Sequence, residues 1–211
     1  SIDERVFTRE KRDGLTAKIE GFEKIPGWSN EKVKNLLERN FNRRWLYGNI
    51  SAFQYIDRPE TQAHYRVAGR AEGQGIQSVL TKGEKQSVKI YREEERLRDE
   101  SLLRIMAHEI GHHQDWENNN RLPIQERLQF LREATARFES GNRLQSHYVD
   151  KDIPKEYADK RFNSQDMLYR RVKEYWATII EYFTTNPEGL RHSHPEDYLL
   201  AKEWYERITR D

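Results

Sequence analysis

The stretch from Asp99 to Trp116 reads DESLLRIMAHEIGHHQDW. Asp99 is a residue type that caps helix N-termini, and apolar residues follow it at helical spacing: Leu102, Leu103, Ile105, Met106, Ala107 and Ile110. The pattern predicts a buried helix. Within this helix His108 and His112 are four residues apart, so they share one face.

Two histidines on one helix face can direct both imidazoles at a single metal ion. Glu109 lies about 100° round the helix from His108, from where it can reach a water bound to that ion. The pattern therefore indicates Zn²⁺ with His108 and His112 as ligands and Glu109 as the catalytic general base. Gly111 favours this interpretation. A mid-helix glycine costs about 1 kcal/mol of stability relative to alanine, and this cost is understandable if another backbone or a substrate approaches closely at that position. A helical scaffold with core histidines remains the alternative.

Two further polar residues follow the motif. His113 points about 100° away from His112, so it is predicted to be a surface residue or to lie behind the ligands. Asp115 returns to the ligand face three residues after His112, where its carboxylate can orient an imidazole through the free N–H. A solvent-facing carboxylate is the alternative for Asp115.

A third ligand must come from elsewhere, because a catalytic zinc ion has three protein ligands and one open position. The sequence has no cysteine, which leaves histidine and carboxylates, and it does not continue the H-E-x-x-H-x-x-G-x-x-H pattern. Glu174 and Glu133 are the candidates. One turn after Glu174 lies Thr178, a small hydrogen-bonding residue that suits a position behind the ligand, whereas Arg137 follows Glu133 with a charge that opposes Zn²⁺. Glu174 is preferred and Glu133 is the runner-up.

The rest of the sequence indicates an α+β fold. A helix is predicted from the N-cap Ser29 through SNEKVKNLLERNFNRRW, and everything after Arg98 is predicted to be mainly helical. Between them, short β-prone runs predict a small mixed sheet. The runs are GNISAFQYIDRP, AHYRVAGRAEG, IQSVLTKGE and SVKIYREE, and the expected helix breaks are ENNNRLP, ESGNRLQ, KDIP, TTNPEG and HPED. We expect one domain over 1–211, with the first helix and the sheet in 1–98 and the helical part, which carries the site, in 99–211.

Composition limits the classes of partner. Charged residues make up 35% of the chain, but the formal net charge is only +1. The sequence therefore shows no large positively charged region of the kind that binds nucleic acid. The 5 Trp, 11 Tyr and 8 Phe can build an ordered aromatic core. No run approaches the roughly 20 apolar residues of a membrane-spanning helix, and no signal-peptide core is present. We expect a secreted or cytosolic protein.

The order of four segments resembles the catalytic domain of anthrax lethal factor and its relatives, including the small Pro-Pro endopeptidases, which are gluzincin metallopeptidases. The segments are SVKIYRE, LLRIMAHEIGHHQDW, KEYWATIIEYFTTNPEGL and HPEDYLLAKEWYERI, between Ser87 and Ile208. In that family an aspartate follows the second histidine at the place of Asp115, and two aromatics and an alanine follow the glutamate ligand, as they do after Glu174. The resemblance implies a zincin-like fold and a zinc-dependent endopeptidase that acts on a polypeptide substrate.

The chain also departs from that family. Thr178 stands where the family commonly has an acidic residue. The family's transition-state tyrosine lies upstream of the glutamate ligand, and the nearest tyrosine here is Tyr169, at a different offset. Tyr169 is therefore the candidate for stabilising the oxyanion, with His192 and His194 as weaker candidates.

The strand before the motif helix is a candidate substrate-binding element. Its residues Val88, Lys89, Ile90 and Tyr91 alternate between two faces, and the strand can pair with an extended peptide as an added strand. A different interpretation of the whole chain is a catalytically inactive peptidase-fold module that binds other proteins. The intact Glu109 argues against that alternative, because a non-catalytic module has no need for the base.

Overall fold

The computed structural model describes residues 17–42, 50–56, 68–72, 86–91, 99–158 and 164–209. The chain divides into two compact units, 1–113 together with Asp211, and 114–210. The boundary between them falls inside one continuous helix, α5 (Asp99–Arg121). The helix predicted around the two histidines is therefore confirmed. Each unit has its own buried residues and is described separately.

The first unit contains a small mixed sheet. It consists of β1 (Lys18–Glu20), β2 (Ile50–Ile56), β3 (Ala68–Glu72) and β4 (Gln86–Tyr91), in the order β1-β2-β4-β3. β1 and β4 each run parallel to β2, and β3 runs antiparallel to β4. The expected α+β class with a small mixed sheet is confirmed. The β-prone run at 76–84 lies outside the described residues.

The position of β4 corrects one prediction. Val88, Lys89, Ile90 and Tyr91 do form a strand, but β4 is an inner strand that pairs with β2 on one side and with β3 on the other. Both of its backbone edges are occupied by neighbouring strands, so β4 has no free edge for an added peptide strand. Strand addition at these residues is therefore excluded.

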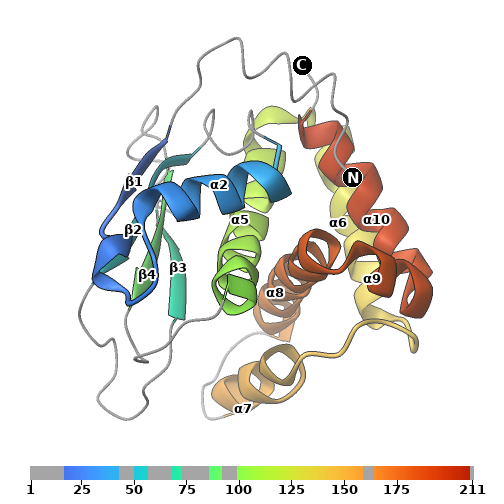
Figure 1. Ribbon diagram of the computed structural model, residues 1–211. Helices are drawn as coiled ribbons and strands as arrows, with labels where there is room; N and C mark the ends of the chain where they lie inside the picture. Colours follow the sequence, from blue (N-terminus) through green and yellow to red (C-terminus); the bar gives the residue numbers. More distant parts are fainter. Residues whose placement is uncertain are drawn as a thin grey trace. The chain divides into compact units, whose positions relative to one another are not determined.

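The first predicted helix is confirmed as α2 (Asn30–Asn40). The hydroxyl oxygen of Ser29 accepts a hydrogen bond from the Lys32 backbone N–H at 3.0 Å, which is the expected N-cap. The helix buries Val33, Leu36 and Leu37 and contacts β1 and the short 3₁₀ helix η1 (Phe22–Lys24). Figure 1 shows α2 lying across the sheet. The helix ends at Asn40, earlier than predicted, because the chain turns extended at Phe41.

The described part of the second unit is helical. It contains the end of α5, α6 (Ile124–Glu139), the π-helix η2 (Tyr148–Asp152), α7 (Ile153–Ala158), α8 (Ser164–Thr185), α9 (Pro187–Ser193) and α10 (Pro195–Thr209). The predicted helix breaks match these boundaries except at KDIP. There η2 continues directly into α7, and Pro154 lies near the start of α7.

Aromatic side chains form the core of the second unit. The Phe130 ring of α6 lies edge-on to Trp176 of α8 at 5.0 Å and to Trp204 of α10 at 5.2 Å, measured between ring centroids. Such T-shaped contacts place the positive edge of one ring on the negative face of another. All three rings are buried. They fix the packing of α6, α8 and α10 against one another.

A buried carboxylate connects the same three helices. Asp197 of α10 is fully buried, and it accepts hydrogen bonds from the Arg137 Nε of α6 at 3.1 Å and from the Leu144 backbone N–H at 3.1 Å. The Tyr175 hydroxyl of α8 also donates to it. Burial and the Asp197 carboxylate raise the pKa of Tyr175, so this hydroxyl keeps its proton. Asp197 therefore satisfies three donors from separate parts of the unit.

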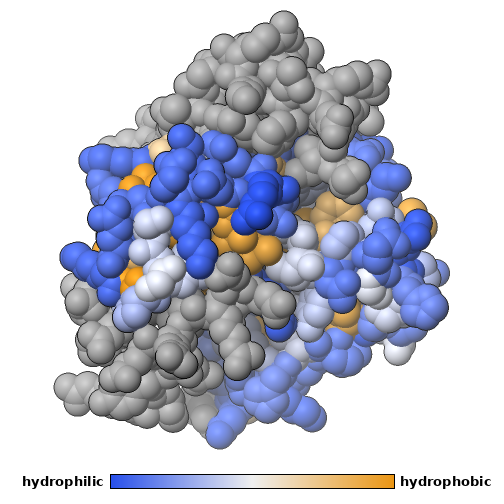
Figure 2. All heavy atoms as spheres, viewed as in Figure 1, coloured by the Kyte–Doolittle hydropathy of each residue, from blue (hydrophilic) through white to orange (hydrophobic). Residues whose placement is uncertain are grey.

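The surface is consistent with the high charge content. Hydrophilic residues cover most of the described surface on the face drawn in Figure 2, and hydrophobic residues show in small separate areas. Among the described helices, none combines the length and the hydropathy that crossing a bilayer requires. The expectation that the described part lacks a membrane-spanning helix is confirmed.

Replacing Asp197 by alanine should lower the free energy of unfolding by about 3–5 kcal/mol, because Arg137, Tyr175 and the Leu144 N–H lose a buried acceptor. Glu196→Ala is the matched control. Glu196 pairs with the same Arg137 but is 60% exposed, so its removal should cost less than about 1 kcal/mol. Urea unfolding followed by circular dichroism measures both. Equal losses in the two variants would contradict the central role of Asp197.

Candidate functional site

The two histidines of the motif lie on α5. Their ring centroids are 5.0 Å apart and the rings are inclined at 78°, so both imidazoles lie on the same side of the helix. Leu102, Met106, Ala107 and Ile110 in the same part of α5 are buried. Glu109 follows His108 directly and is half-buried. The helical spacing predicted from the sequence is therefore present.

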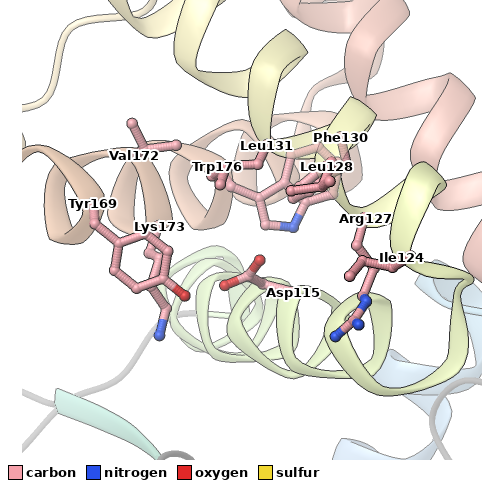
Figure 3. Close-up of a pocket in the computed structure, with 10 residues that line it drawn as sticks. All are labelled: Asp115, Ile124, Arg127, Leu128, Phe130, Leu131, Tyr169, Val172, Lys173 and Trp176. Carbon is pink, nitrogen blue, oxygen red and sulfur yellow. The ribbon is translucent and has the colours of Figure 1, made fainter.

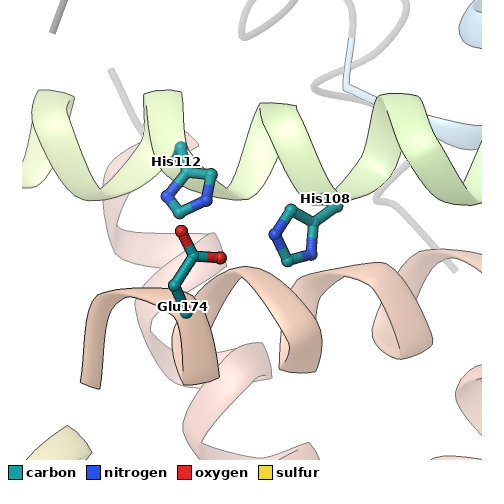
Figure 4. Close-up of side chains that lie close together, drawn as sticks. All are labelled: His108, His112 and Glu174. Atoms are coloured by element: carbon teal, nitrogen blue, oxygen red, sulfur yellow. The ribbon is translucent and has the colours of Figure 1, made fainter. Parts of the chain in front are cut away.

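Glu174 lies on α8, in the second unit. Its immediate neighbours Tyr175, Trp176 and Ala177 are buried, whereas Glu174 itself is half-buried. One nitrogen each from His108 and His112 and one carboxylate oxygen of Glu174 lie within 4.8 Å of one another, and Figure 4 shows the three side chains. Among the described residues this is the group of histidine and carboxylate side chains that is close enough to share an ion.

The donor set is chemically suited to zinc. Two imidazole nitrogens and one carboxylate oxygen are the ligands of one class of catalytic zinc site, which leaves a fourth position open. Ligand atoms of a tetrahedral zinc ion lie about 3.3 Å apart, given bonds of about 2.0–2.2 Å. The three ligand atoms lie within 4.8 Å of one another, an upper limit wider than that spacing. The types of donor therefore fit the ion.

The runner-up ligand, Glu133, has a different partner. Its carboxylate Oε2 accepts a hydrogen bond from the Trp204 indole Nε1–H at 2.6 Å. This bond links α6 to α10 within the second unit, and Glu133 is not part of the group formed by His108, His112 and Glu174. Glu133 thus satisfies a largely buried indole donor.

Thr178 lies one turn after Glu174, as the sequence places it, and is buried. Its hydroxyl donates to the backbone carbonyl of Glu174 at 2.9 Å, a local bond along the helix. In this structure the hydroxyl therefore contacts the main chain at Glu174, whereas the predicted role needs a bond to the carboxylate.

Asp115 and Tyr169 line a cavity of the second unit (Figure 3). Asp115 is only 6% exposed, so the alternative of a solvent-facing carboxylate is wrong. Tyr169 of α8 is 47% exposed. Burial first, and the charge of Asp115 second, raise the pKa of Tyr169, which keeps its hydroxyl protonated. The charge of Asp115 therefore acts on the Tyr169 phenol.

Tyr148 is a candidate residue that the sequence did not single out. It lies in η2, and its hydroxyl oxygen accepts a hydrogen bond from Arg170 Nη2 at 2.8 Å. Arg170 is itself held by Glu156 at 2.8 Å. Burial and the charge of Glu174 raise the pKa of Tyr148. No local motif marks this tyrosine, because its relation to Glu174 arises from how η2 packs against α8.

The remaining histidines have other surroundings. His113 is only 1% exposed, so the prediction of a surface position is wrong, and a position behind the ligands remains. His192 is exposed on α9, and the His194 Nδ1 forms a hydrogen bond with the Ser193 hydroxyl at 2.8 Å. Neither His192 nor His194 belongs to the group around Glu174.

Comparison with protein-family models, with curated proteins and with solved structures finds no match to this chain. The resemblance to the lethal factor family therefore stays a prediction from motifs. The function must be inferred from the residues and their geometry.

Proposed function

We propose that the protein is a zinc-dependent endopeptidase of the gluzincin class with a zincin-like fold. The observation that carries the proposal is the group formed by His108, His112 and Glu174, with Glu109 next to the first ligand. This sequence pattern and donor set are those of metal-dependent peptide hydrolysis. A catalytically inactive binding module would require no base at Glu109.

Different residues of the chain have different roles in the proposed reaction. His108, His112 and Glu174 would hold the ion. When bound, zinc would make a water molecule more acidic and would polarise a carbonyl group. Glu109 takes a proton from the attacking water and passes it to the nitrogen of the leaving amine. The products are a new carboxyl terminus and a new amino terminus.

Tyr148 is better suited than Tyr169 to stabilise the oxyanion of the tetrahedral intermediate. Arg170 already donates to the Tyr148 oxygen, so the tyrosine's own proton is available for donation to a substrate. Its raised pKa keeps that proton in place at neutral pH. Burial and the charge of Asp115 raise the pKa of Tyr169 in the same direction, so the preference for Tyr148 rests on its contact with Arg170.

An extended polypeptide is the proposed substrate, and β3 replaces β4 as its proposed binding strand. β3 is the last strand of the described sheet and pairs with β4 on one side only. Backbone hydrogen bonds from its other edge can hold an added peptide strand without fixing the sequence of that peptide. The proposal therefore implies that the enzyme accepts many substrate sequences at the positions that are held through the peptide backbone.

The Glu174→Ala variant should lose zinc affinity by more than about 100-fold, since removing a group behind a ligand already costs about 10–100-fold. Glu133→Ala should keep the zinc of the parent, because Glu133 contacts Trp204 and not the histidines. Plasma mass spectrometry of protein purified without a metal-affinity tag measures the metal content. Loss of zinc in Glu133→Ala with retention in Glu174→Ala would reverse the ligand assignment. A parent that binds no added zinc would refute the metal site.

The Glu109→Gln variant should retain zinc but lose turnover by about 10²–10⁴-fold, the usual contribution of a general base. The measurement is release of fluorescent fragments from a labelled unfolded protein, with metal content determined in the same samples. Glu188→Gln, the same change at a carboxylate of α9 that is 74% exposed, is the control, and it should keep most of the activity. Unchanged cleavage in the Glu109→Gln enzyme would contradict the assigned base and favour a binding module.

The Tyr148→Phe variant should lower kcat by about 10²–10³-fold, the effect of removing one oxyanion donor, with little change in KM. Tyr169→Phe should lower kcat by much less, because the described hydrogen bonds of Tyr169 include no arginine donor like the one that Arg170 provides to Tyr148. Steady-state kinetics on the same substrate compares the two phenylalanine variants. A large loss in Tyr169→Phe alone would return the oxyanion role to Tyr169.

A further inference from the structure

The π-helix η2 is tied to the part of α8 that precedes Glu174 by one turn. Arg170 and Arg171 of α8 lie four and three residues before Glu174, on the same face of the helix. Arg170 Nη2 donates to the Tyr148 hydroxyl at 2.8 Å. Arg171 Nε donates to the Val149 backbone carbonyl at 2.9 Å. Because side chains of a helix lean towards its N-terminus, Glu174 leans towards the turn that holds η2.

Asp150, in the middle of η2, connects this π-helix to two arginines and to its own backbone. Its Oδ1 pairs with Arg171 Nη2 at 3.4 Å and also accepts from Arg143 Nη2. Its Oδ2 accepts from the Ser146 backbone N–H at 3.0 Å. The side chains of Arg143, Asp150 and Arg171 are only 10%, 17% and 22% exposed. Solvent therefore screens these contacts less than it screens pairs on the open surface.

The charge of Asp150 is needed for this set of contacts. Burial by itself raises the pKa of Asp150, but the hydrogen bonds from Arg143 and the Ser146 N–H and the charges of both arginines lower it below its ordinary value. The carboxylate is therefore ionised at neutral pH, and both of its oxygens accept. An asparagine has nearly the same shape, but it lacks the charge and one of the two acceptors.

The two arginines are themselves held by an aromatic ring. The guanidinium groups of Arg143 and Arg171 lie 4.4 Å and 4.7 Å from the centre of the Phe138 ring, within the range of a cation–π contact. Phe138 belongs to α6 and is 5% exposed. Asp150 thus meets guanidinium groups whose positions are already fixed by the core of the second unit.

We propose that Asp150 is a positioning residue that holds the Tyr148 hydroxyl on the Glu174 side of α8. It acts through Arg171 and Arg143, which fix η2, and η2 carries Tyr148. Arg170 alone does not fix the backbone of η2, because its contact is with the phenol oxygen. The inference rests on the proposed function for the oxyanion role of Tyr148, but the position of the hydroxyl can be tested without metal or substrate.

Metal-free protein labelled with ¹³C at the tyrosine Cζ tests that position. The Tyr148 signal, assigned with the Tyr148→Phe variant, should shift in Asp150→Asn. It should also shift in Arg171→Lys, which keeps the charge but loses the guanidinium, and which keeps the test valid if Asp150→Asn fails to fold. Asp152→Asn is the matched control in the same π-helix. Asp152 is 52% exposed and pairs with the exposed His147, so its replacement should leave the Tyr148 signal in place.

Kinetics test the consequence for the reaction. Asp150→Asn should lower kcat about 10–100-fold with little change in KM, since a misplacement of about 1 Å can cost about 100-fold. In the Tyr148→Phe background the same substitution should have almost no further effect. A residue that acted only through stability would lower kcat by the same factor in both backgrounds.

An unmoved Tyr148 signal in both Asp150→Asn and Arg171→Lys would overturn the inference, and so would equal losses of kcat in the two backgrounds. A parent protein that cleaves no substrate would instead refute the proposed peptidase. In that case the Tyr148 signal alone would decide whether Asp150 positions this hydroxyl.

Discussion

The buried carboxylate of Asp197 is the interaction on which the second unit depends. It collects donors from α6, from α8 and from the Leu144 backbone, and no solvent reaches it. The donor from α8 is the Tyr175 hydroxyl, and Tyr175 directly follows Glu174 in the sequence. The rotation of α8 about its own axis is therefore fixed by a buried hydrogen bond next to the candidate ligand. A half-buried carboxylate on a freely turning helix would have no such defined direction.

Three consecutive residues of α8 show how one helix can serve three purposes. Because successive side chains are about 100° apart, Glu174, Tyr175 and Trp176 point in three directions. Glu174 is directed to the candidate metal ligands, Tyr175 to Asp197, and Trp176 to Phe130 and to the cavity. The anchor in the middle stabilises the orientation of both neighbours. This arrangement explains why a charged ligand can be held in a helix that is otherwise largely apolar.

Features that depend on local sequence could be predicted, and those that depend on distant pairing could not. The N-cap Ser29, the helix around His108 and most helix breaks follow from neighbouring residues, and the structure has them. The strand at Val88 was predicted for the same reason. Its inner position depends on pairing with β2 and β3, and a local sequence pattern does not show the order of strands in a sheet. β1 has only three residues, too few for a periodic signal. Tyr148 was missed because η2 and α8 are distant in sequence and meet only in the folded unit.

The choice between Glu174 and Glu133 as the candidate third ligand rested on an incomplete reason. The sequence argument compared the residues one turn on, Arg137 and Thr178. The cation Arg137 does have another task, since it pairs with Asp197, and Glu133 accepts a bond from Trp204. Thr178, however, contacts the Glu174 main chain, so its hydroxyl is not what sets Glu174 apart. What distinguishes the two glutamates is that Glu133 contacts Trp204 within the second unit, whereas Glu174 is the carboxylate that lies within 4.8 Å of the histidine nitrogens.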